Sequence, residues 1–218
     1  MRRRIAFISS NFTWGGSETL WSETAAELAR RGHDVRVYKN RLNPREGNVA
    51  KLRALGIKRI ELAHFPMLPN KLYSAVARFA PFLSIGYQAL KLHLGLRLRG
   101  RPDLIVLSQG GNHDGWLIGA VLRRLGYPYV LICQKATDLY WPQDNWRREI
   151  DAVYRAAGHV FFVSEHNWRL TEEQLGRRLE SASVARNPFL VPWDKPLSWP
   201  EGDGVFHLAC VGRLYPKE

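Results

Sequence analysis

Residues 4–21 read RIAFISSNFTWGGSETLW and combine an apolar run, two adjacent glycines and the start of an amphipathic pattern. The run RIAFIS is typical of a strand that is buried on both faces of a parallel sheet. From Ser17 onward, Leu20, Trp21, Ala25, Leu28 and Ala29 recur at helical spacing, and Gly32 favours a left-handed helix end. The stretch therefore predicts a strand, a turn at Gly15 and Gly16, and a helix.

The same strand and helix patterns alternate along most of the chain. Further strands are predicted in residues 33–39, 58–62, 102–108, 127–133, 159–164 and 181–187. Helices are predicted in residues 48–56, 115–126, 146–158 and 165–180, the last of them capped by Ser164. Such alternation indicates an α/β fold, a Rossmann-like doubly wound and mostly parallel sheet of about seven strands with helices on both faces.

Two segments interrupt this alternation. Residues 70–101 are apolar, aromatic and basic, and we expect two helices there, interrupted at Pro81. Residues 189–204 are rich in proline and tryptophan, which favours an ordered linker. The apolar strand pattern that follows indicates that residues 205–218 begin a second domain, after a first domain at residues 1–188.

Composition limits the class of protein. The 218 residues are 45% apolar and carry a net charge of +12, which favours a globular protein with an anionic partner. No apolar run approaches the length of a membrane span, and the first residues lack the pattern of a secretory signal. We expect Cys133 and Cys210 to be reduced core residues of a cytoplasmic protein, with no disulfide and no metal.

The glycine pair has two interpretations of similar weight. The turn after the first strand of a parallel sheet faces the ligand crevice, where free backbone amides at a helix start attract phosphate. Alternatively, the two glycines only permit a tight turn with positive φ. A bound NAD is disfavoured because the glycine spacing is wrong, and because Lys39 and Asn40 stand where an acidic residue usually binds the ribose.

The motifs in their order resemble those of a known family. They are IAFIS, GGSE, LARRGHDVRVY, PDLIVLSQGGNHDG, YPYVLICQKATDLYWP, AGHVFFVSEHNWRLTEEQLG, SVARNPF and HLACVGRLYPKE. This series resembles the N-terminal half of a retaining GT-B glycosyltransferase of family 4, over nearly the whole chain. The resemblance implies an acceptor-binding domain facing a second domain that grips a nucleotide sugar. It also implies that this chain alone is inactive.

The resemblance assigns roles to several residues. Gly15 and Gly16 match the loop that closes over the sugar diphosphate and acceptor. Arg213 matches the arginine that neutralises the leaving diphosphate, and Lys217 stands near it. Many family members have a histidine where this sequence has Gln134, followed by Lys135, so donor or acceptor identity is in doubt at this position.

The implied reaction needs few protein groups. Retaining transfer in this family is thought to use the departing phosphate oxygen as base, so that no enzymic nucleophile is required. The sequence contains no pair of carboxylates placed for glycoside chemistry and no D-x-D motif, and we expect no cofactor or metal besides the nucleotide sugar.

Polar residues after the predicted strands are further candidates. His113 could bind the acceptor or shuttle a proton, with Asp114 orienting it. The alternative is helix capping by Asn112 or Asp114 beside a solvent-exposed histidine. Glu18 is interpreted as a helix first-turn charge rather than a base, and Asp138 is ambiguous. The residues assigned to substrate binding besides the glycine pair, Gln134, Lys135 and Lys217 are Ser17, Glu18, Asp138 and Asn187.

The partners follow from charge and resemblance. Residues 71–101 combine basic, aromatic and apolar side chains, so we expect peripheral docking on an anionic membrane at its cytoplasmic face. Ordinary core packing of Leu90, Leu94 and Leu98 is the alternative. A noncatalytic carbohydrate- or nucleotide-binding module is the second functional reading. Nucleic-acid binding ranks last because no recognition motif accompanies the charge.

Overall fold

The computed structural model describes residues 1–11, 14–61, 81–191, 194–196, 204 and 208. In these residues the chain forms one seven-stranded sheet with the order β3-β2-β1-β4-β5-β6-β7. Every neighbouring pair of strands is parallel. The strands are β1 (Arg4–Ser9), β2 (Asp34–Lys39), β3 (Lys58–Glu61), β4 (Leu104–Gln109), β5 (Tyr129–Cys133), β6 (Val160–Phe162) and β7 (Ala182–Val184).

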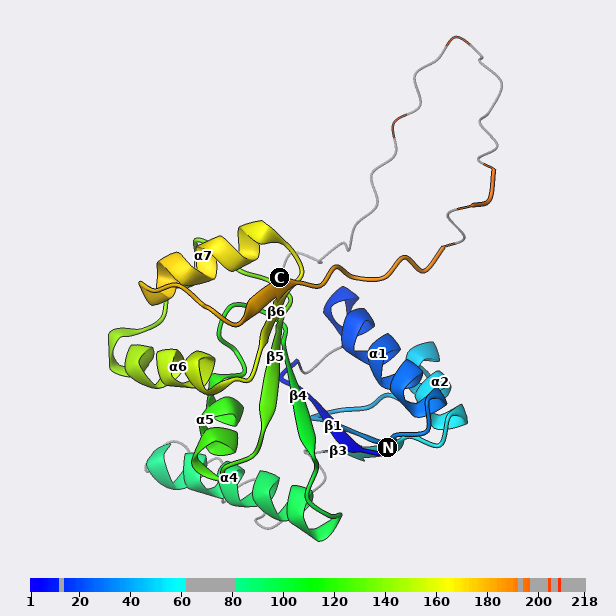
Figure 1. The fold of residues 1–218 in the computed structure, drawn as a ribbon, viewed down its shortest axis with the longest axis horizontal. Helices are drawn as coiled ribbons and strands as arrows, with labels where there is room; N and C mark the ends of the chain where they lie inside the picture. The colour runs from blue at the N-terminus through cyan, green and yellow to red at the C-terminus, as the bar shows by residue number, and fades with distance from the viewer. Residues whose placement is uncertain (12–13, 62–80, 192–193, 197–203, 205–207, 209–218) are drawn as a thin grey trace, which may run out of the picture. The chain divides into compact units, whose positions relative to one another are not determined.

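Helices connect the strands and cover both faces of the sheet. The described part of the chain contains α1 (Thr19–Arg30), α2 (Gly47–Ala54), α4 (Pro81–Leu98), α5 (Trp116–Arg124), α6 (Asp144–Ala156) and α7 (Glu165–Leu175), and the 3-10 turn η1 (Gly16–Glu18). In Figure 1, α1 and α2 lie on one side of the sheet, and α4, α5, α6 and α7 lie on the other. The predicted Rossmann-like α/β fold is therefore confirmed.

The period-two alternation of strand side chains builds the two core layers. In β1, Ile5 and Phe7 pack with Trp21 of α1. Ala6 and Ile8 point to the opposite face and join the larger cluster under α4, α5, α6 and α7. Since both faces are covered, every position of β1 after Arg4 is buried, which explains its continuous apolar pattern.

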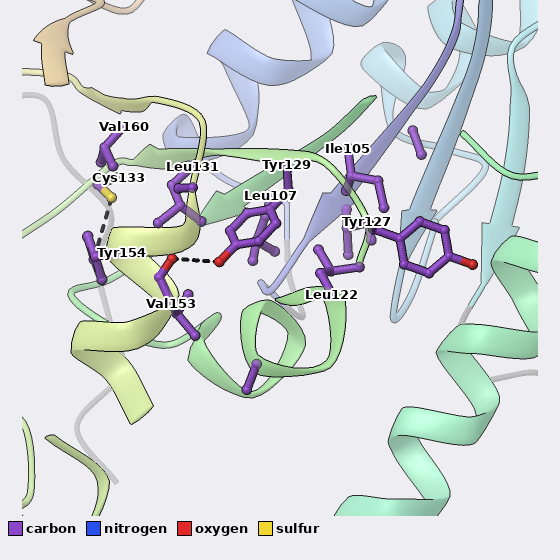
Figure 2. Close-up of a cluster of buried hydrophobic side chains, with 14 of the residues drawn as sticks. Ile105, Leu107, Leu122, Tyr127, Tyr129, Leu131, Cys133, Val153, Tyr154 and Val160 are labelled. Atoms are coloured by element: carbon purple, nitrogen blue, oxygen red, sulfur yellow. Dashed lines mark hydrogen bonds between the residues drawn. The ribbon is translucent and has the colours of Figure 1, made fainter. Parts of the chain in front are cut away.

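The larger core layer contains buried polar atoms that are bonded inside it (Figure 2). The Tyr129 hydroxyl donates a 2.6 Å hydrogen bond to the backbone oxygen of Val153 in α6. Cys133 is buried and its thiol is free, as predicted, with the sulfur 3.6 Å from the Tyr154 hydroxyl. The prediction for Cys210 lies outside the described residues.

Some predicted boundaries were wrong. The helix predicted over 165–180 begins at Glu165 with Ser164 as its cap, as predicted, but it ends at Leu175, because Gly176 adopts a left-handed φ of +69° that stops it. The left-handed end predicted at Gly32 is confirmed, with a φ of +84°. Of the two helices expected in 70–101, the second is α4, which begins at Pro81, and the region of the first lies outside the described residues.

The packing of α4 corrects another expectation. Leu90 and Leu98 are 46% and 72% exposed, whereas Leu92 and Leu96 are buried in the core. The helix therefore packs against the core through Leu92 and Leu96, and the side of the helix that carries Leu90 and Leu98 faces outward. The alternative that Leu90, Leu94 and Leu98 are ordinary core positions was wrong for Leu90 and Leu98.

The chain separates into two compact units, Met1–Pro188 and Phe189–Glu218. The first unit contains the whole sheet. Most of the second unit, including nearly all of residues 205–218, lies outside the described part of the chain, so the assignment of a linker and a second domain stays a prediction. Among the described helices, none is both long enough and apolar enough to cross a membrane.

Candidate functional site

The candidate site lies where the connections of the sheet change direction. From β1 the chain proceeds to β2 and β3 on one side, and β4 and the later strands continue on the other. In such sheets ligands bind beyond the carboxyl ends of the strands at this switch point. The register places Ser9, the last residue of β1, between Lys39 of β2 and Ser108 of β4. The loops after β1 and β4 therefore flank the switch point.

The glycine turn occupies this position, and its backbone is not left-handed. Gly15 has an extended conformation, with φ −155° and ψ −169°, and its carbonyl accepts a 3.0 Å hydrogen bond from the amide of Glu18. Gly16 is absent from the described glycines with positive φ. The alternative in which the pair only permits positive φ was therefore wrong. A Cβ at Gly16 would meet no atom within 4 Å, so the space beside the turn is open.

Glu18 is the last residue of the η1 turn, and its side chain is completely buried. It is the helix-start charge that the sequence predicts, at the N-cap of α1, but its carboxylate points into the protein. The carboxylate accepts hydrogen bonds from the Ser9 hydroxyl, from Asn11 Nδ2 at 2.9 Å and from Trp21 Nε1 at 2.9 Å. Its oxygens are thus occupied by protein groups and are not offered to a ligand in this structure.

The counter-ion of Glu18 is Lys39, which sequence reasoning did not select as a site residue. Lys39 Nζ lies 3.0 Å from Glu18 Oε2, and the two side chains are 1% and 0% exposed. The ammonium also donates to the Ser9 hydroxyl at 3.2 Å and to the backbone oxygen of Asn11 at 2.6 Å. Burial lowers the pKa of Lys39, and the Glu18 carboxylate opposes that shift. Lys39 is thus held by internal partners at the carboxyl end of β2.

The loop after β4 is tied to the loop after β1. The Asp114 carboxylate accepts a 2.6 Å hydrogen bond from the Ser10 hydroxyl and further bonds from the backbone amides of Gly110 and Gly111. Burial raises the pKa of Asp114, and these hydrogen bonds counteract the rise. Gly110 is required because a Cβ there would overlap the side-chain amide of Asn11.

Asn112 has an unusual backbone conformation in the same loop. With a φ of +26°, it is the one non-glycine residue with positive φ in the described part of the chain. Its Nδ2 donates to the backbone oxygen of Tyr140 and to Gln174 Oε1, and its Oδ1 accepts from the amide of Thr137. The unusual backbone is therefore held by side-chain bonds to the loop after β5, which is the pattern expected at a functional turn.

His113 is buried, so the alternative of a solvent-exposed histidine was wrong. Its ring makes an edge contact with Tyr154, at 5.7 Å between ring centroids. Burial lowers the pKa of His113 to about 4, although the adjacent Gln174 raises it slightly. Neither ring nitrogen has a hydrogen-bond partner among the described residues, and Asp114 bonds to Ser10 and to backbone amides instead. The expected orienting role of Asp114 toward His113 is not observed.

Gln109 is the last residue of β4, and Gln134 directly follows the neighbouring strand β5. Gln109 Oε1 accepts from the Tyr154 hydroxyl at 2.9 Å and from the Cys133 thiol at 3.3 Å. The side-chain nitrogens of Gln109 and Gln134 are buried and have no partner among the described residues. Their unused donors, with the two free nitrogens of His113, leave hydrogen-bonding capacity at this edge of the sheet.

The other predicted residues are more peripheral or untested. Lys135, Asp138 and Asn187 are exposed, and Ser17 accepts a 2.7 Å hydrogen bond from Asn11 Nδ2. Arg213 and Lys217 lie outside the described residues. Among the described residues no group of three or more His, Cys, Asp or Glu side chains is arranged to hold a metal ion. The expectation of no metal or cofactor stays a prediction.

Sequence reasoning missed the supporting residues. Lys39 and Gln109 could have been found from their position, because each ends an apolar strand at the carboxyl edge. Tyr154 and Gln174 carry no such signal, because they lie within helices whose rotation and packing decide where their side chains point.

A doubly wound parallel sheet with a glycine turn at its switch point defines a Rossmann-like domain, a class of domain in which ligands bind at the carboxyl edge of the sheet. A family model of a glycosyl transferase 4-like domain matches residues 15–188, and the chain belongs to this family. The predicted likeness to the N-terminal half of a GT-B glycosyltransferase is thereby confirmed.

Solved structures support the same fold. HepE (Alr3699) from Anabaena, in complex with UDP and glucose, is 19% identical, with a TM-score of 0.57 over 86% of this chain and 45% of HepE. A glycosyltransferase from Rickettsia africae ESF-5 is 13% identical, with a TM-score of 0.57 over 85% of this chain and 43% of its own. MurG from Acinetobacter baumannii is 15% identical, with a TM-score of 0.51 over 89% and 48%.

The chain therefore spans less than half the length of each of these proteins. No curated protein matches the chain closely enough to count as a relative. The identities are low, so the solved structures establish the architecture, and the chemistry has to be argued from the site itself.

Proposed function

We propose that the chain is the acceptor-binding half of a retaining glycosyltransferase, which transfers a sugar from a nucleotide sugar to a glycan or lipid-linked acceptor. The observation that carries this proposal is the turn at Gly15 and Gly16, with open space beside Gly16, at the switch point of a domain of the glycosyl transferase 4-like family. Backbone amides at such a turn attract phosphate oxygens, and the lack of side chains leaves room for a diphosphate.

The donor is proposed to be held mainly by a second domain. Support comes from HepE, which has been crystallised with UDP-glucose and is about twice as long as the part matched here. Arg213 and Lys217 are proposed to neutralise the leaving diphosphate, an electrostatic contribution that commonly supplies several kcal/mol of barrier reduction. The departing phosphate oxygen then takes the acceptor proton, so that this chain needs to supply no nucleophile.

The residues after β4 and β5 are proposed to position sugar hydroxyls. Gln134 has an unused amide donor, and the exposed Lys135 lies next to it. With a pKa of about 4, His113 is neutral near pH 7 and serves as a hydrogen-bond donor or acceptor rather than as a cation. Asp114 acts through the backbone of its loop, because its oxygens accept the amides of Gly110 and Gly111.

Activity tests this proposal directly. The protein extended by its second domain, incubated with a panel of UDP and GDP sugars, is expected to hydrolyse or transfer one of them. The 218-residue chain alone is expected to show little affinity for the same compounds in calorimetry. Tight binding by this chain without transfer by the longer protein would favour the noncatalytic module instead.

We also propose that the protein docks on the cytoplasmic face of an anionic membrane. In the described half of the basic segment, Leu90 and Leu98 are exposed, and Leu98 lies between the exposed Arg97 and Arg99. Such a mixture favours an interface between water and lipid. Sedimentation with phosphatidylserine vesicles is expected to recover the protein at low salt and to release it at high salt. Equal recovery with neutral vesicles would contradict this.

A further inference from the structure

Lys39 joins the two ends of the segment that carries the glycine turn. Its ammonium donates to the backbone oxygen of Asn11, where the segment begins, and lies 3.0 Å from Glu18 Oε2, where the segment ends. Asn11 adds a second cross-connection, because its Nδ2 donates to Ser17 Oγ at 2.7 Å and to Glu18 Oε1 at 2.9 Å. The residues on both sides of the turn thus converge on one buried charge pair.

The described part of the turn has few other determinants of its conformation. Gly15, the N-cap of η1, has no side-chain capping bond, and the two glycines have no left-handed φ that would favour this turn over others. Among the described residues, two backbone hydrogen bonds close it, from Glu18 N to Gly15 O and from Thr19 N to Gly16 O. A glycine pair loses much conformational entropy when it is fixed, so contacts from outside the turn have to supply its order.

Stability alone is a poor explanation for the buried pair. Desolvating two charges is expensive, and replacing a buried ion pair by well-packed apolar side chains is often neutral or stabilising. Here the pair lies among Trp21, Ser9 and Trp14, whose ring centroid is 5.9 Å from Lys39 Nζ. The ammonium is thus placed where it reaches both ends of the turn.

We propose that Lys39 and Glu18 are positioning residues, which hold the Gly15–Ser17 turn in the conformation that presents its backbone amides at the switch point of the sheet. The inference rests on the proposed function only for the identity of the ligand that the turn receives. Lys39 itself does not touch that ligand, because its ammonium is buried against Glu18, Ser9 and Asn11.

The experiment measures turn order without any ligand. Lys39→Met and Glu18→Gln are combined, which removes both charges and leaves one side-chain oxygen as an acceptor where Ser9, Asn11 and Trp21 now share two. The melting temperature is expected to stay within about 5 °C of the parent value, while either single change lowers it further. The ¹⁵N order parameters of Gly16 and Ser17 are expected to fall from about 0.85 to below about 0.6 in the double variant. Exchange of the Glu18 amide is expected to become at least about tenfold faster.

A second ion pair on α1 provides the matched control. Lys51 Nζ lies 2.6 Å from Glu23 Oε2, and this pair connects α1 to α2 away from the turn. The control variant Glu23→Gln with Lys51→Met is expected to leave the order parameters of Gly16 and Ser17 unchanged. Parent-like order in the Lys39→Met, Glu18→Gln variant would overturn the inference and leave the pair a purely structural one.

Two further outcomes are separated by this design. If the double variant does not fold, Lys39→Arg, which keeps both charges of the pair but changes the length and shape of the cationic side chain, decides by the same loss or retention of turn order. Loss of turn order in a protein that transfers no sugar from any nucleotide would refute the proposed function and still support the positioning role.

Discussion

Ser10 and Asp114 are joined by a 2.6 Å hydrogen bond although 104 residues separate them in the sequence. The bond connects the loop after β1 to the loop after β4, across the switch point of the sheet. It therefore couples the segment that carries the glycine turn to the segment that carries Asn112 and His113.

This coupling is measurable with a double-mutant cycle. We expect Ser10→Ala and Asp114→Ala each to lower the free energy of unfolding by about 1–2 kcal/mol, because each leaves a partner without its bond. The double variant should lose less than the sum, by about 0.5–3 kcal/mol. Urea denaturation at pH 7 provides the measurement, and strictly additive losses would show that the two loops are independent.

Acid should destabilise the protein through His113. Its pKa is lowered in the folded state from 6.5 to about 4, so between these values the unfolded chain binds more protons. The stabilisation that neutral His113 adds to the free energy of unfolding is therefore complete above about pH 6.5. It is lost as the pH falls toward about 4, and it amounts to at most about 3 kcal/mol.

The free energy of unfolding, measured at pH 7 and at pH 4.5, tests this prediction. His113→Gln should reduce the difference between the two values. The control variant His166→Gln, at an exposed position, should leave the difference unchanged. An unchanged slope in the His113 variant would mean that this histidine is not the titrating group.

Gly119 should resist enlargement because α5 packs closely on α6. A Cβ at this position would overlap Val153 Cγ1, in a core layer that has no spare volume for it. We expect Gly119→Ala to cost about 1–3 kcal/mol of stability. Gly47→Ala, in α2, is the matched control, since nothing lies within 4 Å of its Cβ and it should be neutral or stabilise by up to about 1 kcal/mol. Equal effects of the two changes in denaturant titrations would contradict this packing.

Gly16→Ala separates function from folding. The added methyl group meets no atom of the described protein within 4 Å, and the residue has no left-handed φ, so we expect stability to change by less than about 0.5 kcal/mol. If a diphosphate approaches this turn, the same methyl group should lower kcat/KM of the protein with its proposed second domain at least about tenfold. Parent-like kinetics in the stable variant would remove the turn from the proposed site.

Much of the fold follows from local patterns. Apolar runs such as RIAFIS predict strands that are buried on both faces, and their alternation with amphipathic segments leaves a parallel, doubly wound sheet as the solution that covers every strand. The ends of helices were harder to place, as α7 shows, because a pattern of apolar residues continues past the glycine that ends the helix.

The site was predictable in its location and less so in its chemistry. The rule that ligands bind at the carboxyl ends of strands selects Gly15, Gly16 and His113 from the sequence, and the family resemblance adds Gln134. It does not reveal that His113 is buried, or that Asp114 bonds to Ser10 rather than to the histidine next to it. These features depend on how two loops from distant parts of the chain pack together.

The sequence by itself determined the strands, the position of the glycine turn and the edge of the sheet where it lies, because hydrophobic periodicity and turn residues act over a few neighbouring positions. Only the tertiary structure decided that Lys39 and Glu18 pair in the interior. That pairing needs β1 and β2 to align with Ser9 opposite Lys39, and it needs α1 to begin where Glu18 points inward. Charges that are exposed in the unfolded chain become partners only when this register excludes water from both of them.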